Sequence, residues 1–328
     1  MTHWQGMAGS GRVFFATGLA WLLLMAVGPA LAEEIRGEAP GLKQGEKRAE
    51  TLVIGRVTNR PKKHIEGLRG MVNYVVPHLA RAGIRQGRVV FARDNAQMQR
   101  YLAEGRVDWV SESAFSALEF RERSGAQLLL RRWKGGVAEY HTVFITRIDS
   151  PIQSLADLKG RRIAFEDAGS TSAFQVPAAT LLEENLELVE LNTPRESPAA
   201  HQVGYAFAGG EINVVTWVSR GLADAGAVSN LDWHDSERVP EGIKKQLRIF
   251  HRTDSFPRGV ELVRGGLDPA VKAGLKELLL QAHLDPEGVK ALKGYNKTSR
   301  FDDFSGGVEA LMAPAYRLWP LLNKATDQ

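Results

Sequence analysis

A run of hydroxyl side chains follows a short apolar segment in the stretch FEDAGSTSAFQVP, residues 165–177. Gly169 permits a tight turn, and Ser170, Thr171 and Ser172 stand directly before a segment with helical character. The first backbone N–H groups of a helix have no helical acceptor, and the helix dipole favours negative charge there. Together with the N–H groups of Ser172 and Ala173, the three hydroxyls predict a receptor for a phosphate-sized anion.

A purely structural explanation of the same residues is also open. Serine and threonine are common N-cap residues, so one hydroxyl would cap the helix and the other two would be incidental. Pro177 lacks a backbone N–H, and the pattern therefore predicts that the helix ends at Val176.

The first 32 residues have the layout of a secretory signal peptide. Arg12 precedes the apolar run VFFATGLAWLLLMAVG, and Ala30-Leu31-Ala32 forms an A-x-A cleavage pattern before two glutamates. We expect cleavage after Ala32 and export to the periplasm, with an uncleaved membrane anchor as the alternative. Residues 33–50 are polar and without periodicity, which predicts a flexible leader.

The composition excludes several kinds of site. The chain has no cysteine, which excludes a disulfide, a thiolate metal site, a cysteine nucleophile and a lipid-modified cysteine. Its 42 basic and 38 acidic residues are spread along the chain, without the clustering that nucleic-acid binding requires. The eight histidines show no metal-ligand spacing, and we expect neither a metal nor a cofactor.

Strands and helices alternate after residue 50, which predicts an α/β fold with largely parallel sheets. The expected strands include 51–57, 88–93, 161–167, 203–209 and 224–230. We predict two α/β lobes of similar size, one from residues 51–146 and 251–328 and the other from 147–250. Two chain crossings between them imply a hinge and closure around a ligand.

Two segments share one order of features and predict facing loops. YLAEGRVDWVSES (101–113) and WVSRGLADAGAVSN (217–230) both read helix, glycine, strand and small polar residues. Gly105 and Gly221 are natural helix C-caps. Ligands bind off the carboxyl ends of strands in open α/β sheets, so Ser229 and Asn230 become candidate ligand residues on the second-lobe loop. Ordinary α/β organisation explains the same order equally well.

EDAGSTSAFQVP resembles the G-S-T-S-G-(aromatic)-x-V-P signature of the periplasmic phosphonate-binding proteins, the solute receptors of phosphate, phosphite and phosphonate ABC importers. Further similar stretches are DSPIQSLADLKGRRIAFED, GLADAGAVSNLDW and RTDSFPRGVELVRGGLDPAVKAGLKELLL, so the likeness runs from about Thr51 to about Phe304. The resemblance implies a bilobed, type II-like periplasmic-binding-protein fold with a two-segment hinge. It also implies an oxyanion held by Ser170, Thr171 and Ser172, with Ala173 where the family often has glycine.

The remaining candidate ligand residues come from comparison with the family pattern. Phe115 in SESAF takes the place of a tyrosine that covers the ligand, and Glu112 adds a carboxylate nearby. Glu211 begins a second-lobe helix, where it would meet a ligand ammonium group or simply favour the helix dipole. Tyr140 and His141 precede the first crossing and are candidates for lining the cleft, with a structural role as the alternative for His141.

The sequence therefore predicts a monomeric, exported solute-binding protein that captures a phosphonate, phosphite or phosphate and delivers it to the membrane permease of an ABC importer. A receptor of the same fold that serves a membrane sensor is one alternative. An exported hydrolase is another, although the G-x-S-x-G and H-E-x-x-H motifs are missing from the sequence. We expect no enzymatic activity.

Overall fold

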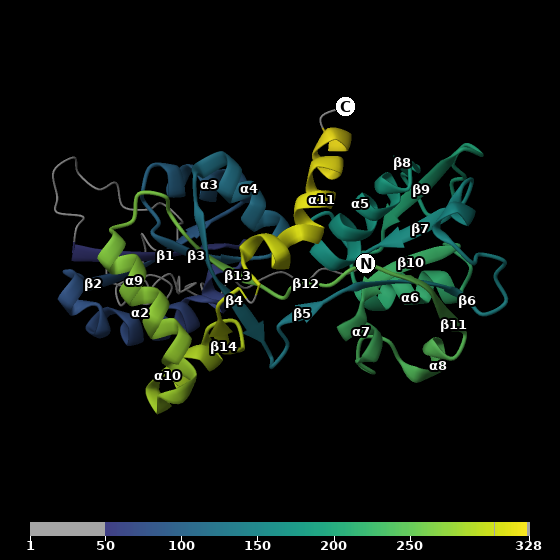
Figure 1. Cartoon of the computed structure of the whole chain (residues 1–328). Coiled ribbons are helices and arrows are strands. Elements are labelled where there is room, and N and C mark those ends of the chain that lie inside the picture. Colours follow the sequence, from purple (N-terminus) through teal and green to yellow (C-terminus); the bar gives the residue numbers. More distant parts are fainter. Residues whose placement is uncertain (1–49, 305, 327–328) are drawn as a thin grey trace, which may run out of the picture.

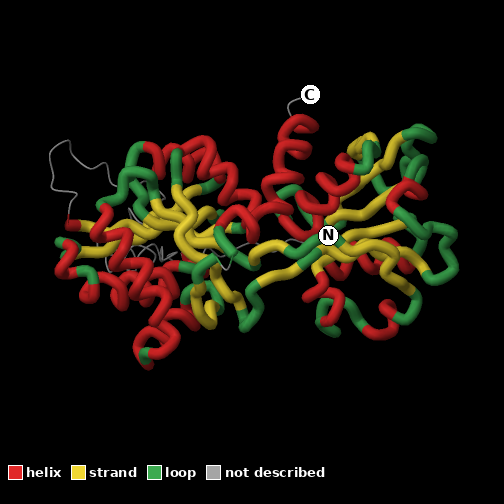
Figure 2. Tube along the Cα trace, viewed as in Figure 1, coloured by secondary structure: helices red, strands yellow, loops and turns green. Residues whose placement is uncertain are grey.

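The computed structural model describes residues 50–304 and 306–326 (Figure 1). The predicted signal peptide and all but the last residue of the predicted leader lie outside these residues. Twelve of the described strands form two six-stranded sheets, which lie side by side with helices on both faces of each (Figure 2). No helix of the described segments combines the length and the apolar character that crossing a bilayer requires.

The first sheet has the strand order β14-β4-β13-β3-β1-β2. Its strands are β1 (Thr51–Val57), β2 (Gln86–Ala92), β3 (Trp109–Glu112), β4 (Gln127–Lys134), β13 (Val260–Val263) and β14 (Thr298–Asp302). The helices of this lobe are α2 (Ile65–His78), α3 (Asn95–Ala103), α4 (Ala114–Ser124), α9 (Pro269–Gln281) and α10 (Pro286–Gly294).

The second sheet has the strand order β11-β6-β10-β7-β9-β8. Its strands are β6 (Thr142–Arg147), β7 (Arg162–Phe165), β8 (Glu187–Glu190), β9 (Gln202–Phe207), β10 (Ala225–Ser229) and β11 (Leu247–Arg252). The helices of this lobe are α5 (Val176–Glu183), α6 (Glu211–Ser219), α7 (Asn230–His234) and α8 (Glu241–Lys244).

Local sequence signals located most of these elements. Asp94 accepts a hydrogen bond from the backbone N–H of Gln97 at 2.8 Å and caps α3. Gly105 and Gly221 have φ values of 65° and 70°, as expected for left-handed residues at helix ends. The prediction of largely parallel sheets is wrong in part, because β13, β4 and β14 pair antiparallel in the first sheet and β6 and β11 do so in the second. Both sheets are therefore mixed. Their antiparallel members include the strands next to the two crossings, which are β4 and β13 in the first lobe and β6 and β11 in the second.

The chain passes between the lobes at two short strands that pair with each other. β5 (Glu139–Tyr140) and β12 (Phe256–Pro257) form an antiparallel two-stranded sheet, with Phe256 opposite Tyr140. The helix α11 (Val308–Thr326), drawn in yellow at the centre of Figure 1, packs against both α4 and α5. The sequence analysis assigned this segment to the first lobe, whereas its helix contacts both lobes beside the hinge.

Candidate functional site

The serine–threonine loop lies at the carboxyl end of β7 and opens a helix. The Ser170 hydroxyl oxygen accepts a hydrogen bond from Ala173 N–H at 3.2 Å, so Ser170 is the N-cap residue. No acceptor in the described part of the chain receives the N–H groups of Thr171 and Ser172. The N–H group of Ala173 serves the cap, which leaves those of Thr171 and Ser172 as the donors for an anion.

The prediction that the helix ends at Val176 is wrong. Residues Thr171–Gln175 form a π-helical turn, in which the N–H of Gln175 donates to Ser170 O at 2.9 Å and that of Val176 donates to Thr171 O. In this π-helical pattern each carbonyl accepts from the N–H five residues later, so the partner of Ser172 O would be the nitrogen of Pro177. That nitrogen carries no hydrogen and cannot donate. Pro177 then occupies the first turn of α5, where proline is tolerated, and the helix continues to Glu183.

Thr142 supplies the donor that Pro177 lacks. Its hydroxyl donates to Ser172 O at 2.6 Å, and the residue is 1 % exposed. Thr142 begins β6, so this bond ties the serine–threonine loop to the strand that follows the crossing between the lobes.

T142V should lower the free energy of unfolding by about 1 to 3 kcal/mol, because the carbonyl of Ser172 loses its hydroxyl donor. It should also weaken the affinity for phosphate, which serves as a probe of the predicted anion site, since the π-helical turn is then free to shift. The matched control is T146V on the same strand, which removes a buried hydrogen bond to Asp224 O of 2.8 Å away from the loop. Urea unfolding and calorimetry on both variants separate the effects, and equal phosphate affinity in the two variants would contradict the positioning role.

Two carboxyl groups meet beside the serine–threonine loop. Glu166 follows β7 directly, and its carboxyl group lies within hydrogen-bonding reach of the Ser170 hydroxyl and of Glu211. Burial raises the pKa of Glu166 to about 7, and the hydrogen bond with Ser170 opposes this effect while Glu211 adds to it. On its other side Glu211 accepts from Arg238 Nη1 at 2.8 Å. The sequence analysis selected Glu211 and missed Glu166, which it placed inside the expected strand 161–167, whereas β7 ends at Phe165.

The raised pKa of Glu166 predicts a pH-dependent stability. The stabilising contribution of the protonated carboxyl is complete below pH 4.5 and is lost as the pH rises through about 7. The free energy of unfolding should fall between pH 5 and pH 8 as Glu166 loses its proton. In E166Q this fall should be smaller by about 1 to 3 kcal/mol, because glutamine does not titrate. Melting temperatures across this range test the effect, with the exposed-site variant E277Q as control. Parallel pH profiles for E166Q and the unmodified protein would contradict it.

Tyr140 joins the serine–threonine loop to the hinge. The residue is 6 % exposed, and its hydroxyl lies within hydrogen-bonding reach of Ser172 and of Arg258. The Arg258 guanidinium carbon stands 4.6 Å from the centre of the Tyr140 ring. The structure therefore places Tyr140 next to the loop, and its role as a residue that lines the cleft stays a prediction.

Three other candidates hold the neighbouring loop in place. Asn230 Oδ1 accepts from His141 N at 2.9 Å, and Asn230 N donates to His141 O at 2.9 Å. Ser229 is 1 % exposed, and its hydroxyl caps α7 by accepting from Asp232 N at 3.0 Å. The Ser229 hydroxyl and Asn230 Oδ1 are thus occupied within the protein. Burial, followed by the charges of Arg252 and His234, lowers the pKa of His141.

The two first-lobe candidates lie in different surroundings. Phe115 is 2 % exposed, and its ring centre stands 6.0 Å from that of Phe256 in the core beside the hinge. A ligand contact would require this ring to leave its packing. Glu112 lies at the end of β3, where burial raises its pKa to about 7 against the opposing charge of Arg56. Glu112 therefore belongs to a first-lobe cluster of charges and does not join Glu166 and Glu211.

A pocket of about 630 Å³ opens between the lobes next to Arg258. Arg56, Lys134 and Lys297 line it from the first lobe, and Asp232 does so from the second. The sequence analysis missed these cations, because they are distributed over separate segments and carry no local motif.

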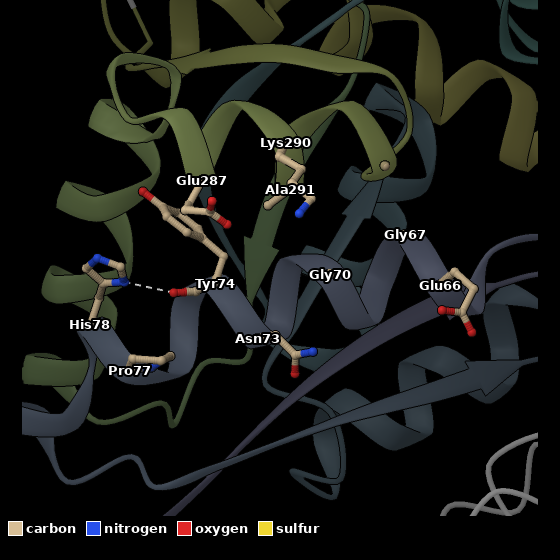
Figure 3. A pocket seen from close by; sticks show the side chains of 11 residues that line it. Glu66, Gly67, Gly70, Asn73, Tyr74, Pro77, His78, Glu287, Lys290 and Ala291 are labelled. Atoms are coloured by element: carbon tan, nitrogen blue, oxygen red, sulfur yellow. Dashed lines mark hydrogen bonds between the residues drawn. The ribbon is translucent and has the colours of Figure 1, made fainter.

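A second hollow, of about 530 Å³, lies on the first lobe between α2 and α10 (Figure 3). Tyr74, Glu287 and Lys290 line it, and His78 Nδ1 is 2.8 Å from Tyr74 O. It contains none of the candidate ligand residues, and its carboxylates and lysine give it mixed charge.

Comparison with known proteins identifies the family of this chain. The family model for the periplasmic substrate-binding proteins of phosphonate ABC transporters matches residues 65–306. The phosphate-import protein PhnD of Mycolicibacterium smegmatis is 28 % identical over 151 residues, which cover 45 % of this chain and 46 % of that protein. The chain thus spans just under half the length of this curated relative.

Solved structures share the fold of this chain. XAC2383 from Xanthomonas citri is 39 % identical in a chloride-bound structure, with a TM-score of 0.75 over 84 % of this chain and 99 % of that one. Its ATP-bound structure is 38 % identical, with a TM-score of 0.75 over 85 % and 98 % of the two chains. PhnD1 from Prochlorococcus marinus, in complex with methylphosphonate, shares the fold at 16 % identity, with a TM-score of 0.55 over 84 % and 99 % of the two chains.

Proposed function

Since this chain belongs to the periplasmic substrate-binding proteins of phosphonate ABC transporters, we propose that it captures a small phosphorus oxyanion between its lobes and delivers it to an ABC permease. The observation that carries the proposal is the pair of N–H donors at Thr171 and Ser172, which have no acceptor among residues 50–304 and 306–326 and are set among three hydroxyls at a helix N-terminus. The helix α4 of the first lobe contacts this turn, so the anion would lie where the two lobes meet.

The proposed ligand shell differs in part from the one expected from the sequence. Ser170, Thr171 and Ser172 hold the oxyanion, and Tyr140 lies beside them at the hinge. Glu166 and Glu211 together offer an acceptor to a protonated oxyanion or to a ligand ammonium group. We assign residues 51–146 and 251–328 to one moving lobe and 147–250 to the other. Export would follow cleavage of the signal peptide after Ala32.

A thermal-shift panel on protein purified from the periplasm, and refolded to remove carried-over ligand, tests this function. The panel consists of phosphate, phosphite, methylphosphonate, aminoethylphosphonate and sulfate, with ATP included because the Xanthomonas relative has been solved bound to it. A ligand at about one hundred times its Kd should add roughly 2.7 kcal/mol of stability. A selective shift with a phosphorus compound is the expected result, and a flat panel would contradict the proposal.

The same fold also serves receptors that report to a membrane sensor, and the ligand site alone does not separate the two partners. Transport of the labelled ligand into cells that carry this protein and its neighbouring permease would identify the importer. Uptake that is unchanged after deletion of the protein would favour the sensor.

A further inference from the structure

The pocket between the lobes is larger than one phosphorus oxyanion requires. Its volume of about 630 Å³ lies within the range of roughly 300 to 1,000 Å³ that is typical of sites for whole organic ligands. The buried Tyr140 side chain lies between this pocket and the serine–threonine loop, because its hydroxyl interacts with Ser172 on one side and with Arg258, a lining residue of the pocket, on the other. A ligand that reaches from the loop to the pocket would pass along Tyr140 and Arg258.

The lining of this pocket is strongly cationic. Seven of its lining residues are lysine or arginine, and two are aspartate. One of the seven, Arg238, is paired with Glu211, whereas Lys134 and Lys297 have exposed side chains at the mouth of the pocket. The excess positive charge suits an occupant that carries several negative charges.

Two guanidinium groups in the pocket have unused donors. Nε of Arg56 and Nε of Arg258 are buried and have no hydrogen-bond partner within the described residues. Arg56 donates through Nη1 to Asn296, so one edge of its guanidinium is held while Nε is left without an acceptor. Buried polar atoms normally find a partner, and these two therefore point to a group that supplies one.

The positive charges affect the neighbouring titratable groups. Lys134 is exposed as a residue, but its ammonium group is partly shielded from solvent; this desolvation, followed by the charges of Arg258, Arg132 and Arg56, lowers its pKa to about 8. Burial and the charge of Arg56 lower the pKa of His64 to about 4. An anion bound in this pocket would relieve the repulsion among these cations.

We propose that Arg56, Arg258, Lys134 and Lys297 form a second anion subsite, which takes the distal groups of a ligand that carries a chain of two or more phosphates. Arginine presents a fork of N–H donors that matches phosphate oxygens, and lysine adds mobile positive charge at the entrance. The proposal rests on the proposed function, since the first phosphate of the chain occupies the serine–threonine loop. The chain belongs either to an inorganic polyphosphate or to a nucleotide.

Calorimetry on the refolded periplasmic protein tests the subsite with orthophosphate, pyrophosphate, tripolyphosphate and ATP. Tripolyphosphate should bind at least tenfold more tightly than orthophosphate. K134M/K297M should remove most of this difference and change orthophosphate affinity by less than threefold. Both side chains are exposed, so the variant should fold normally. R258M, which alters the deeper part of the subsite, should have the same effect.

The matched control is K159M/K290M, which removes the same number of charges from exposed positions outside this pocket. Equal affinity for orthophosphate and tripolyphosphate would overturn the subsite, as would an equal loss of tripolyphosphate affinity in K134M/K297M and in the control. Comparison of ATP with tripolyphosphate identifies the source of the chain, because tighter binding of ATP assigns part of the pocket to the nucleoside.

The two proposals fail in distinguishable ways. In one case S170A/T171A loses orthophosphate binding, and the unmodified protein binds tripolyphosphate no more tightly than orthophosphate. This result would leave the proposed function intact and reject the second subsite. Absence of binding by every phosphorus compound would reject both.

Discussion

S170A/T171A should bind orthophosphate or methylphosphonate about 2 to 4 kcal/mol more weakly than the unmodified protein, which is roughly a 30- to 1,000-fold increase in Kd. Each hydroxyl is expected to donate to a charged oxygen, and each such hydrogen bond contributes about 1 to 3 kcal/mol. The total is less than a strict sum, because neighbouring donors on one anion do not act independently. Isothermal titration calorimetry on ligand-free protein measures the change directly.

The control for this variant must reproduce the loss of a helix cap. Ser170 caps its own helix, so S170A should also lower the free energy of unfolding by about 1 kcal/mol. Ser154 is the N-cap of the short helix Leu155–Leu158 in the same lobe, and S154A should have a similar cost without any effect on affinity. Unchanged affinity in S170A/T171A would show that the anion binds elsewhere in the cleft.

E261A should lower the free energy of unfolding by about 3 to 5 kcal/mol, the range for removal of one partner of a buried ion pair. Glu261 is fully buried in β13 and accepts from Trp109 Nε1 at 2.6 Å, Ser111 Oγ at 2.6 Å and Tyr295 OH at 2.8 Å. Its Oε1 also lies 3.4 Å from Nε of Arg132. The substitution therefore leaves three donors without their acceptor and a buried guanidinium without its ion-pair partner.

Equilibrium unfolding in guanidinium chloride measures this effect, and E66A is the control because the Glu66 side chain is 87 % exposed. E261Q retains one acceptor oxygen and should lose less stability than E261A. A loss below about 1 kcal/mol in E261A would mean that the cluster relaxes around the missing carboxylate. E261A should affect ligand binding only through the fraction of protein that is unfolded, and the folded variant should keep the affinity of the unmodified protein.

Residues close together in the sequence carried the reliable predictions. The segment 51–57 forms β1 as expected, Asp94 caps α3, and Gly105 and Gly221 end their helices, because each of these signals depends on hydrogen bonds or hydropathy within one or two turns of chain. The one local prediction that is wrong concerns Pro177. A π-helical turn shifts the hydrogen-bond register, and a threonine from another strand supplies the missing donor.

Residues far apart in the sequence determine the chemistry of the cleft. Glu166 and Glu211 are 45 positions apart, and only the parallel pairing of β7 with β9 brings the loops after these strands together. The resemblance implied that Phe115 covers the ligand, whereas packing against Phe256 buries its ring. Its burial depends on a strand that returns from the other lobe, and no pattern around Phe115 contains that information.

The sequence by itself determined the family, the two-lobed α/β architecture and the serine–threonine loop at a helix N-terminus, since a motif and its secondary structure are encoded within a short segment. Only the tertiary structure decided which charges surround that loop. Arg56, Lys134, Arg258 and Lys297 come from four separate segments and meet in one pocket because the chain crosses between the lobes and returns. Electrostatic interaction depends on distance in space, and distance along the chain does not reveal it.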